Sequence, residues 1–585
     1  MSAAVAGPPR AGRGGAVLRL GTDTVLWALL ALAVVLIVLV PLLYTVDAAF
    51  YAETRTGLST TRSLKAVLAV YTSAEYLSLL FNAIVLALLV TAISLVVGVA
   101  MALLVGRTDL PFKPVLDIFI ILPLFLSPFT GLIAWIALGS EKTGFINGMI
   151  KAVLGLVMEN PPALIDVWTY AGIVWVMFLF FCPFVYLFTL GSLRSMDASL
   201  EEAARTSGAS VLQTVLRVTL PMSLPAIFAS GLLVFILAAE MYTIPGIIGG
   251  TFGYVTLPWR IYQDSTVFPV RQAHAAASGT ILLWVTIGGV WLQRRMTRVS
   301  ERYVSITGKG FRGRPLALGR AKWPALAFIG VYVLSADLLP FGALIVSSLM
   351  KFSAPALTAE VFTLKHYAEL FTLQNMLDAL RNTALLAVLS GVLCVSIGLV
   401  ISYAEVRRPS RWTKLLAFVA VLPVAVPGLV YGIGLLWTYI QTPLYGTIWI
   451  LLLAYVAKFL PYGVLVSRTG VLQIHPDLEQ SARMSGASAR QALTHVTMPL
   501  MRSTLIAVLF FVMIMSIKEL SASILLYAQN SQVLSVLTWH YMDSGNYQFA
   551  AAVGVVQSAL MILLVVFTRV VFRVRLESAI GKGGS

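Results

Sequence analysis

Continuous apolar runs of about 20 residues recur along the whole chain, and they constrain the fold more than any other feature of the sequence. A helix of this length crosses a lipid bilayer and satisfies its own backbone hydrogen bonds. The runs are continuously apolar and do not alternate, which favours helices over the strands of a membrane barrel. Only 11% of the residues are charged, against about 25% in an average soluble domain. The sequence therefore predicts an all-α integral membrane protein.

The apolar runs divide into twelve predicted spans, six in each half of the chain. The first six lie near residues 25–48, 79–106, 114–138, 166–192, 219–248 and 273–292. The second six lie near 323–349, 379–405, 415–440, 446–467, 499–527 and 548–568. The predicted domains are an N-terminal tail (1–24), a first six-helix half (25–292), a linker (293–322), a second six-helix half (323–568) and a C-terminal tail (569–585).

The distribution of basic residues predicts that both termini and the linker are cytoplasmic. Only nine of the 41 Lys and Arg residues fall in the loops that this topology places outside, as the positive-inside rule expects. The linker alone holds nine basic residues and one acid, and we expect it to lie near anionic lipid headgroups. The net charge of +16 therefore reflects membrane topology, and no nucleic-acid partner is predicted.

The chain contains an internal repeat whose clearest part is polar. Residues 200–221 (LEEAARTSGASVLQTVLRVTLP) match residues 478–499 (LEQSARMSGASARQALTHVTMP) at 12 of 22 positions, with an offset of 278. Further upstream the offset is 300, as between Gly98 and Gly398. The first half is longer because residues 140–167 face only residues 441–447. Two repeats of the same orientation predict a pseudo-twofold axis along the membrane normal.

Each copy of this polar stretch is predicted to form two short helices joined by a turn on the cytoplasmic side. Small and apolar residues recur at three- and four-residue steps, as on one face of a helix. Gly208 and Gly486 interrupt the pattern, and glycine permits a tight turn there. A helix lying on the lipid surface would explain the apolar face. It would not explain Gly-Ala-Ser at matched positions in both halves.

The same stretch resembles the cytoplasmic signature of permeases in bacterial binding-protein-dependent ABC importers. The first copy carries the pattern as Glu202, Ala203, Ala204, Gly208, Ala209, Leu220 and Pro221. The second copy carries Gln480, Ser481, Ala482, Gly486, Ala487, Met498 and Pro499, so that glutamine replaces the glutamate. The resemblance extends over nearly all of both halves and implies the type I ABC importer permease fold.

In that family the segment is a coupling helix that docks on a separate ATPase subunit. The resemblance therefore implies two ATP-binding ABC subunits, one for each copy, and a solute-binding protein on the outer face. The outer segments near 249–272 and 528–547 are expected to form part of its docking rim. One fused chain would form the whole membrane part, in the bacterial inner membrane. This chain lacks a G-x-x-x-x-G-K-[ST] loop, so ATP is expected to be used by the partners and no cofactor or enzymatic activity is assigned to it.

Three ionisable residues inside predicted spans are candidates for the translocation path, because charge within a membrane is costly. Glu240 lies in the fifth span, and Lys518 and Glu519 lie at the matching place in the eleventh. Two alternatives remain open. These residues face the path of the solute, or Lys518 and Glu519 satisfy a broken helix and pair with their neighbours.

Other residues in the spans have simpler interpretations. Lys458 and Arg381 are expected near span ends, with their long side chains reaching the interface. Prolines are expected to kink the third and ninth spans; they are Pro123, Pro128, Pro423 and Pro427. Cys182 and Cys394 lie in apolar runs without metal-ligand spacing, so no metal site is predicted.

The transported solute is predicted from a second resemblance, at residues 518–527 (KELSASILLY). This segment is similar to the ferric-iron group of permeases, where the place typically reads Lys-Glu-Leu-Pro-Ala-Thr before leucines and Arg-Pro. Ser521, Ser523 and Tyr527 depart from that pattern. Ferric iron is the predicted solute, and 2-aminoethylphosphonate, thiamine or polyamine are alternatives. An alternative of another class is a secondary transporter of the major facilitator type, to whose signature residues 106–113 bear a faint likeness.

Overall fold

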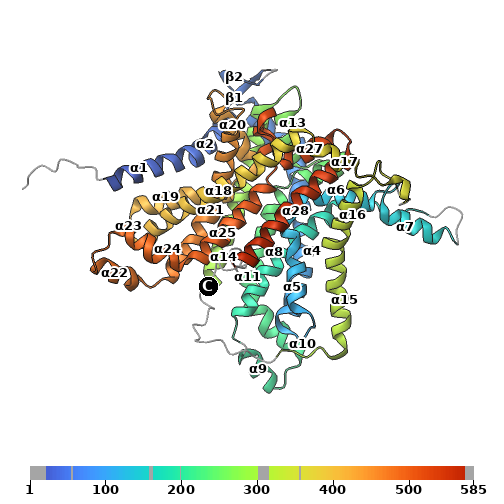
Figure 1. Cartoon of the computed structure of the whole chain (residues 1–585), viewed down its shortest axis with the longest axis horizontal. Coiled ribbons are helices and arrows are strands. Elements are labelled where there is room, and N and C mark those ends of the chain that lie inside the picture. Colours follow the sequence, from blue (N-terminus) through green and yellow to red (C-terminus); the bar gives the residue numbers. More distant parts are fainter. Residues whose placement is uncertain are drawn as a thin grey trace, which may run out of the picture.

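The computed structural model describes residues 22–54, 57–156, 162–197, 199–300, 315–354 and 358–572. Within these residues, nine helices are long and apolar enough to span a membrane, and three further helix pairs bring the number of candidate spans to as many as 12. The predicted all-α membrane fold of about twelve spans is thereby confirmed (Figure 1). Most of the two predicted tails and residues 301–314 of the linker lie outside the described residues.

The first half is built from long helices joined by short ones. The principal elements are α1 (Thr22–Val34), α2 (Val40–Ala48), α4 (Ala74–Arg107), α5 (Lys113–Ile121), α6 (Pro128–Gly139), α8 (Tyr170–Ser195), α11 (Leu220–Ala239) and α14 (Gln272–Ser300). The shorter helices are α3 (Lys65–Thr72), α7 (Phe145–Leu154), α9 (Ser199–Thr206), α10 (Val211–Thr214), α12 (Thr243–Gly250) and α13 (Leu257–Thr266). Because α14 continues to Ser300, the first residues of the predicted linker are helical.

The second half repeats this order. Its principal elements are α15 (Lys322–Val333), α16 (Leu339–Ser348), α18 (Gln374–Arg407), α19 (Arg411–Val421), α20 (Gly428–Tyr439), α21 (Ile448–Gln473), α25 (Arg502–Ile517) and α28 (Tyr547–Val571). The shorter helices are α17 (Lys365–Leu370), α22 (Pro476–Met484), α23 (Ala489–Ala492), α24 (Met498–Leu500), α26 (Ser523–Leu526) and α27 (Leu534–Asp543). Both α4 and α18 have 34 residues and both α8 and α21 have 26, so the sequence repeat is also a structural repeat.

Prolines produce matching irregularities in the two halves. A five-residue π-helical turn precedes Pro41, Pro221, Pro340 and Pro499, each of which is the second residue of the next helical segment. Proline has no N–H and its ring clashes with the carbonyl four residues earlier, so the preceding turn widens by one residue. The first, fifth, seventh and eleventh spans therefore each contain a wide turn near a proline.

The third and ninth spans are broken more sharply than a proline kink would predict. α5 and α6 meet at 102°, and α19 and α20 meet at 116°. A turn of 3₁₀ helix that contains Pro123 or Pro423 ends the first helix of each pair. Ser127 and Val426 then adopt extended backbone because each precedes a proline. The predicted continuous spans 114–138 and 415–440 are therefore wrong in shape, although their prolines were correctly expected to bend them.

The fifth and eleventh spans also end earlier than predicted. α11 ends at Ala239, before α12, and α25 ends at Ile517, before α26. A further bend of 78° separates residues Arg490–Leu500 from Arg502–Ile517. Apolar composition continues through these breaks, so hydropathy alone gave the longer spans 219–248 and 499–527.

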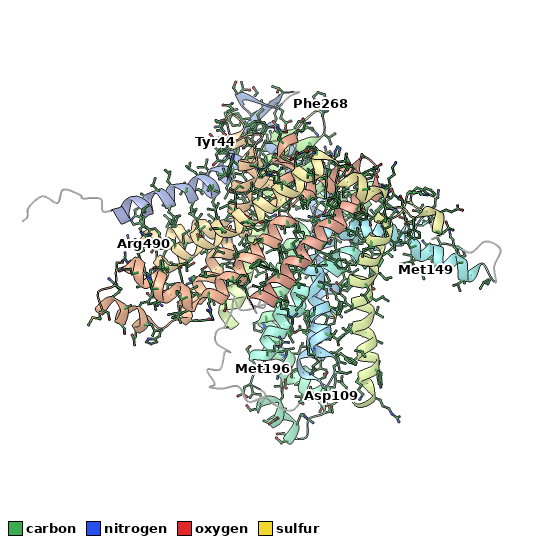
Figure 2. All side chains as sticks on the ribbon, in the orientation of Figure 1. Tyr44, Asp109, Met149, Met196, Phe268 and Arg490 are labelled. Atoms are coloured by element: carbon green, nitrogen blue, oxygen red, sulfur yellow. The ribbon has the colours of Figure 1, made fainter. Side chains whose placement is uncertain are left out.

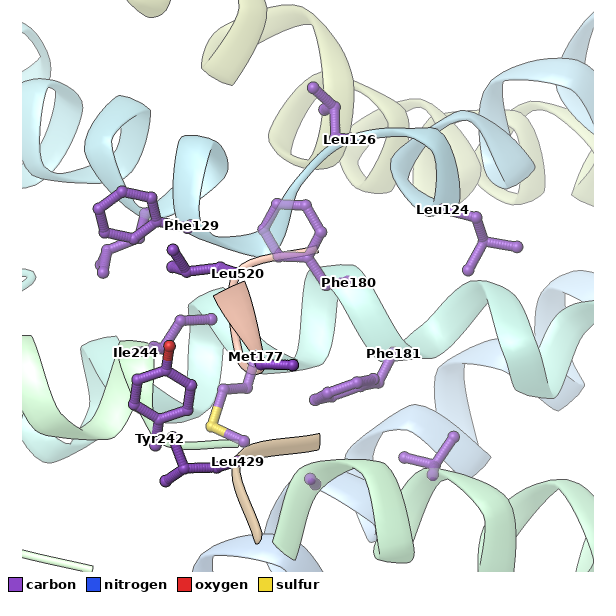
Figure 3. Close-up of a cluster of buried hydrophobic side chains, with 14 of the residues drawn as sticks. Leu124, Leu126, Phe129, Met177, Phe180, Phe181, Tyr242, Ile244, Leu429 and Leu520 are labelled. Carbon is purple, nitrogen blue, oxygen red and sulfur yellow. The ribbon is translucent and has the colours of Figure 1, made fainter. Parts of the chain in front are cut away.

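The broken spans interlock the two halves. α6 packs against α16 and α28 of the second half, and α20 packs against α2 of the first half. Gly434 allows the second contact, because a Cβ at this position would lie 2.3 Å from the Pro41 carbonyl oxygen. Figure 3 shows that Leu429 and Leu520 of the second half share a buried cluster with Met177 and Phe180 of the first. One hydrophobic core therefore crosses the boundary between the repeats.

A small β-hairpin departs from the all-helical prediction. β1 (Tyr51–Thr54) and β2 (Gly57–Arg62) pair antiparallel at the end of the molecule away from α9 and α22 (Figure 1). The carboxylate of Glu53 accepts a hydrogen bond from the His274 backbone N–H at 3.0 Å and contacts His274 Nδ1 at 2.8 Å. These contacts fix the hairpin to the start of α14.

Candidate functional site

The predicted turn between two short helices is present in both copies of the polar stretch. Gly208, between α9 and α10, has φ of 90°, and Gly486, between α22 and α23, has φ of 93°. The next residue in each copy donates its N–H across the turn, from Ala209 to Ala204 O at 3.0 Å and from Ala487 to Ala482 O at 3.1 Å. A Cβ on either glycine would meet nothing within 4 Å. The left-handed backbone, and not lack of space, is therefore what requires glycine here.

The Ser and Gln that follow each glycine complete the turn. Ser210 Oγ accepts from the Gln213 N–H at 3.3 Å, and Gln213 Oε1 accepts from the Ser210 N–H at 2.9 Å. Ser488 and Gln491 make the same pair at 3.2 and 2.8 Å. This capping box satisfies backbone donors at the start of the second short helix. The shared Gly-Ala-Ser-x-x-Gln pattern therefore specifies one rigid shape. We call it a hairpin: the first consists of α9 and α10, and the second of α22 and α23.

A buried carboxylate holds the first hairpin on the membrane helices. Glu201 is 7% exposed and accepts a hydrogen bond from the Thr219 hydroxyl at 2.7 Å. Arg107 Nε, at the end of α4, lies 3.3 Å from Glu201 Oε1. α9 is thereby connected both to α4 and to the start of α11.

The second hairpin has the same anchor with more hydrogen bonds. Glu479 is 5% exposed and accepts from Arg407 Nε at 3.0 Å, from the Tyr403 hydroxyl at 3.0 Å and from the Thr497 hydroxyl at 2.9 Å. Arg407 also donates to Ile474 O at 2.7 Å. The sequence alone did not identify these anchors. Their signal was the recurrence of Arg107 and Arg407 at the same offset of 300 that relates the upstream spans.

The predicted motif residues lie on the open side of the hairpins. In the first copy Glu202 and Ala204 are half-buried and Ala203 and Gly208 are exposed. In the second copy Gln480, Ser481 and Gly486 are exposed and Ala482 is half-buried. Large apolar side chains accompany them, with Leu212 67% and Met484 89% exposed. Each hairpin therefore combines a fixed inner edge with an outer surface that exposes large apolar side chains among polar ones.

The predicted charges of the spans gather where α11 and α25 end. Glu240 is the C-cap residue of α11 and Lys518 is the C-cap residue of α25. Lys518 Nζ donates to Leu124 O, in the broken third span of the other half, at 2.6 Å. Glu519 Oε1 accepts from the Ala522 N–H at 3.0 Å, which caps the turn before α26.

Lys458 belongs to this group, and its predicted place at a span end is wrong. It lies within α21, and its Nζ donates to Glu519 Oε2 at 2.7 Å. Lys518 and Glu519 therefore make the neighbour contacts of the structural alternative. Among the described residues, no hydrogen bond or ion pair reaches the carboxylate of Glu240, which is half-buried. Arg381 is exposed near the start of α18, as expected.

A further acid in a span was missed by the sequence analysis. Asp337 lies in the π-helical turn between α15 and α16 and is 1% exposed. Within the described part of the chain, neither of its carboxylate oxygens has a hydrogen-bond partner. The available signal was an acidic residue in the middle of the predicted seventh span.

Aromatic side chains join the two halves at the end of the molecule away from the hairpins. Trp539 of α27 lies 5.4 Å from Tyr262 and 6.3 Å from Trp259 of α13, measured between ring centroids. Its centroid is 6.4 Å from that of Tyr242, which follows Glu240 by two residues. The two segments expected to form a docking rim therefore meet through tilted and edge-on rings.

Comparisons with known proteins place the repeat in context. The family model described as "Binding-protein-dependent transport system inner membrane component" matches residues 94–298 and 394–581, once in each half. The ferric transport system permease protein FbpB of Actinobacillus pleuropneumoniae is 27% identical over 496 residues, which cover 83% of this chain and 70% of that protein. The protein y4fN of Sinorhizobium fredii, named as an ABC transporter permease, is 27% identical over 88% of this chain and 89% of its own.

A third relative matches only one part of the chain. The permease PhnV of Salmonella paratyphi A, named for a 2-aminoethylphosphonate transport system, is 32% identical over 204 residues. The match covers 33% of this chain and 77% of PhnV. The similarity to FbpB, in contrast, extends over both halves.

Proposed function

Because the chain belongs to the family of binding-protein-dependent transport system inner membrane components, we propose that it forms the complete membrane part of an ATP-driven ABC importer. It is a multi-pass inner-membrane permease and not an enzyme. The family match also argues against a secondary transporter of the major facilitator type. The observation that carries the proposal is the duplication, since the family model and the hairpin each occur once in each half.

Each hairpin is the docking site of one ATP-binding subunit. The exposed Leu212 and Met484 supply apolar contact with that subunit, and the rigid turns at Gly208 and Gly486 fix the shape of each hairpin. Buried anchors at Glu201 and Glu479 would carry movement of the ATPase to α4, α11 and α18. Because the ATP-binding subunits work in the cytoplasm, the hairpins and both termini are cytoplasmic. A solute-binding protein would then dock at the other end, near α13 and α27.

Ferric iron is the proposed solute. The similarity to FbpB, which spans most of both chains, supports this choice. A hard cation prefers oxygen ligands, and the Glu240 carboxylate, free of ion pairs among the described residues, could contact it during passage. The second candidate is 2-aminoethylphosphonate, favoured by the similarity to PhnV and by Lys458 and Lys518 near the same place.

Uptake by cells that carry the complete operon tests the solute. A deletion of this gene should abolish accumulation of radiolabelled ferric iron under iron limitation, and the intact gene should restore it. If the deletion leaves iron uptake unchanged and abolishes growth on 2-aminoethylphosphonate as the sole phosphorus source, the second candidate replaces the first. Co-purification of the ATPase encoded in the operon tests the importer assignment separately, because it does not depend on the solute.

A further inference from the structure

The short helix α7 has no counterpart in the second half and leaves the bundle sideways. It lies within the inserted stretch 140–167, which faces only residues 441–447 in the other half. Figure 1 shows α7 projecting from the side of the molecule, away from α13 and α27. Met149 lies on this projecting helix in Figure 2. Any function of α7 is therefore expected at the lateral surface of the protein and not near the pseudo-twofold axis.

The base of α7 is fixed by one buried amide. Asn147 is 1% exposed, and its Nδ2 donates to Ser140 O at 3.0 Å and to Ile165 O at 2.5 Å. Its Oδ1 accepts from the backbone N–H groups of Leu164 and Ile165, both at 3.1 Å. All four hydrogen-bonding positions of the amide are thus occupied. α7 consequently leaves the bundle in a defined direction.

The part of α7 beyond this clamp exposes an apolar stripe. Met149 is 69% and Val153 65% exposed on the helix, and Leu156, in the turn that follows its end at Leu154, is 85% exposed. Met149 and Val153, four residues apart, share one face of α7, whereas Lys151 lies on the opposite face and is half-buried. Three large apolar side chains exposed together require a covering surface.

The chain on either side of α7 indicates that this surface is lipid. The chain returns past Trp168, whose Nε1 donates to Ser140 Oγ at 3.2 Å, to Tyr170 at the start of α8. Trp and Tyr concentrate where membrane helices reach the bilayer interface. Tyr170 also lines a groove of about 540 Å³ between α4, α8 and α15, whose other walls include Trp175 and Phe328. The apolar stripe therefore begins beside a surface that faces lipid.

We propose that α7 is an interfacial helix that inserts Met149, Val153 and Leu156 into the lipid leaflet on the side opposite to α9 and α22, with Lys151 directed to the headgroups. Amphipathic helices bind the boundary between headgroups and acyl chains in this way. The occupant is the phospholipid bilayer itself. Such an anchor would resist rotation of the first half in the membrane plane, and the second half would lack this restraint.

Site-directed spin labelling of the whole chain in phospholipid nanodiscs tests the proposal. Cys182 and Cys394 are buried and are the only two cysteines, so their replacement by alanine gives a background for single cysteines. A nitroxide would be placed at Met149, Val153 or Leu156, with Lys151→Cys as the matched control on the other helix face. The nanodiscs would contain phosphatidylethanolamine and phosphatidylglycerol.

The expected result is a helical pattern of accessibility. Labels on the stripe should collide several-fold more often with oxygen, which dissolves in acyl chains, than with a water-soluble nickel chelate, and the Lys151→Cys label should show the reverse. Equal access to the chelate at all four positions would overturn the proposal. Protection of the stripe only after a solute-binding protein is added would also overturn it, by making α7 a protein-docking surface. Neither readout depends on transport or on the identity of the solute.

Discussion

Glu240 and Lys518 occupy the same structural position in the two halves, as the C-cap residues of α11 and α25. They are related by the offset of 278 that relates the two hairpins. One half thus presents an acid where the other presents a base. A hypothesis of two symmetric acids, Glu240 and Glu519, fits the register less well, because Glu519 is one residue beyond the match and is paired with Lys458. Glu240 is the acid of this pair without an observed partner among the described residues.

The Lys458–Glu519 pair should contribute strongly to stability. Glu519 is 6% exposed, so Lys458→Met leaves a buried carboxylate without its cation, which costs about 3 to 5 kcal/mol. The double change Lys458→Met with Glu519→Gln should lose less than the sum of the single changes. Thermal unfolding of the purified protein measures this coupling. Arg381→Met, at an exposed cation, is the control and should change little. Strictly additive losses would mean that the two residues do not interact.

Replacing the hairpin glycines should weaken binding of the ATPase subunits. Valine at Gly208 or Gly486 must adopt a left-handed backbone, at a cost of about 1 to 2 kcal/mol, so each turn should distort. The amount of ATPase that co-purifies should fall in both variants. Gly253→Val is the matched control, because Gly253 has φ of 77° and open space but lies near α12 and α13. If both hairpin variants retain as much ATPase as the wild type, the hairpins are not the docking sites.

The second hairpin should be held more firmly than the first. Arg407→Ala leaves the buried Glu479 without its cation, and we expect a loss of about 3 to 5 kcal/mol in the free energy of unfolding. Arg107→Ala should cost less, because Arg107 Nε lies 3.3 Å from Glu201 and Leu103 replaces the hydroxyl that Tyr403 supplies. Thermal unfolding of the two variants side by side gives the comparison. A larger loss from Arg107→Ala would reverse this order.

Removing the carboxylate of Asp337 should stabilise the protein. A buried polar group without a hydrogen bond costs about 1 to 3 kcal/mol, and Asp337→Leu replaces it with an apolar side chain. The variant should unfold at a higher temperature than the wild type. Asp337→Asn keeps a polar group in the same place and should bring no such gain. If Asp337→Leu also abolishes transport while folding well, Asp337 serves the pathway at the expense of stability.

Much of this architecture could be predicted because the two halves of the chain repeat the same sequence pattern. The offsets of 300 and 278 locate equivalent spans and both hairpins in the sequence. The glycine turns were predictable since Gly208 and Gly486 interrupt the same helical pattern. The breaks in the third and ninth spans were not, because an apolar segment has the same hydropathy whether it is straight or bent by 102°.

The buried anchors show a different limit of sequence analysis. Glu201 and Glu202 are adjacent carboxylates, and either could face solvent in an isolated helix. The choice depends on where Thr219 and Arg107 lie in the folded chain. Lys458 was misplaced for the same reason, since its partner Glu519 is 61 residues away in sequence. Pairing across spans is set by packing, and the local pattern does not encode it.

The opposite charges at Glu240 and Lys518 have a consequence for assembly. Two copies of the first half would place a carboxylate at both of these positions, and two copies of the second half would place an ammonium group at both, so neither homodimer could present one charge of each sign. The covalent link between the halves removes this problem by fixing the ratio of acid to base at one to one. It also lets a substitution enter one half without appearing in the other. The single chain can therefore maintain a division of labour that two identical subunits could not.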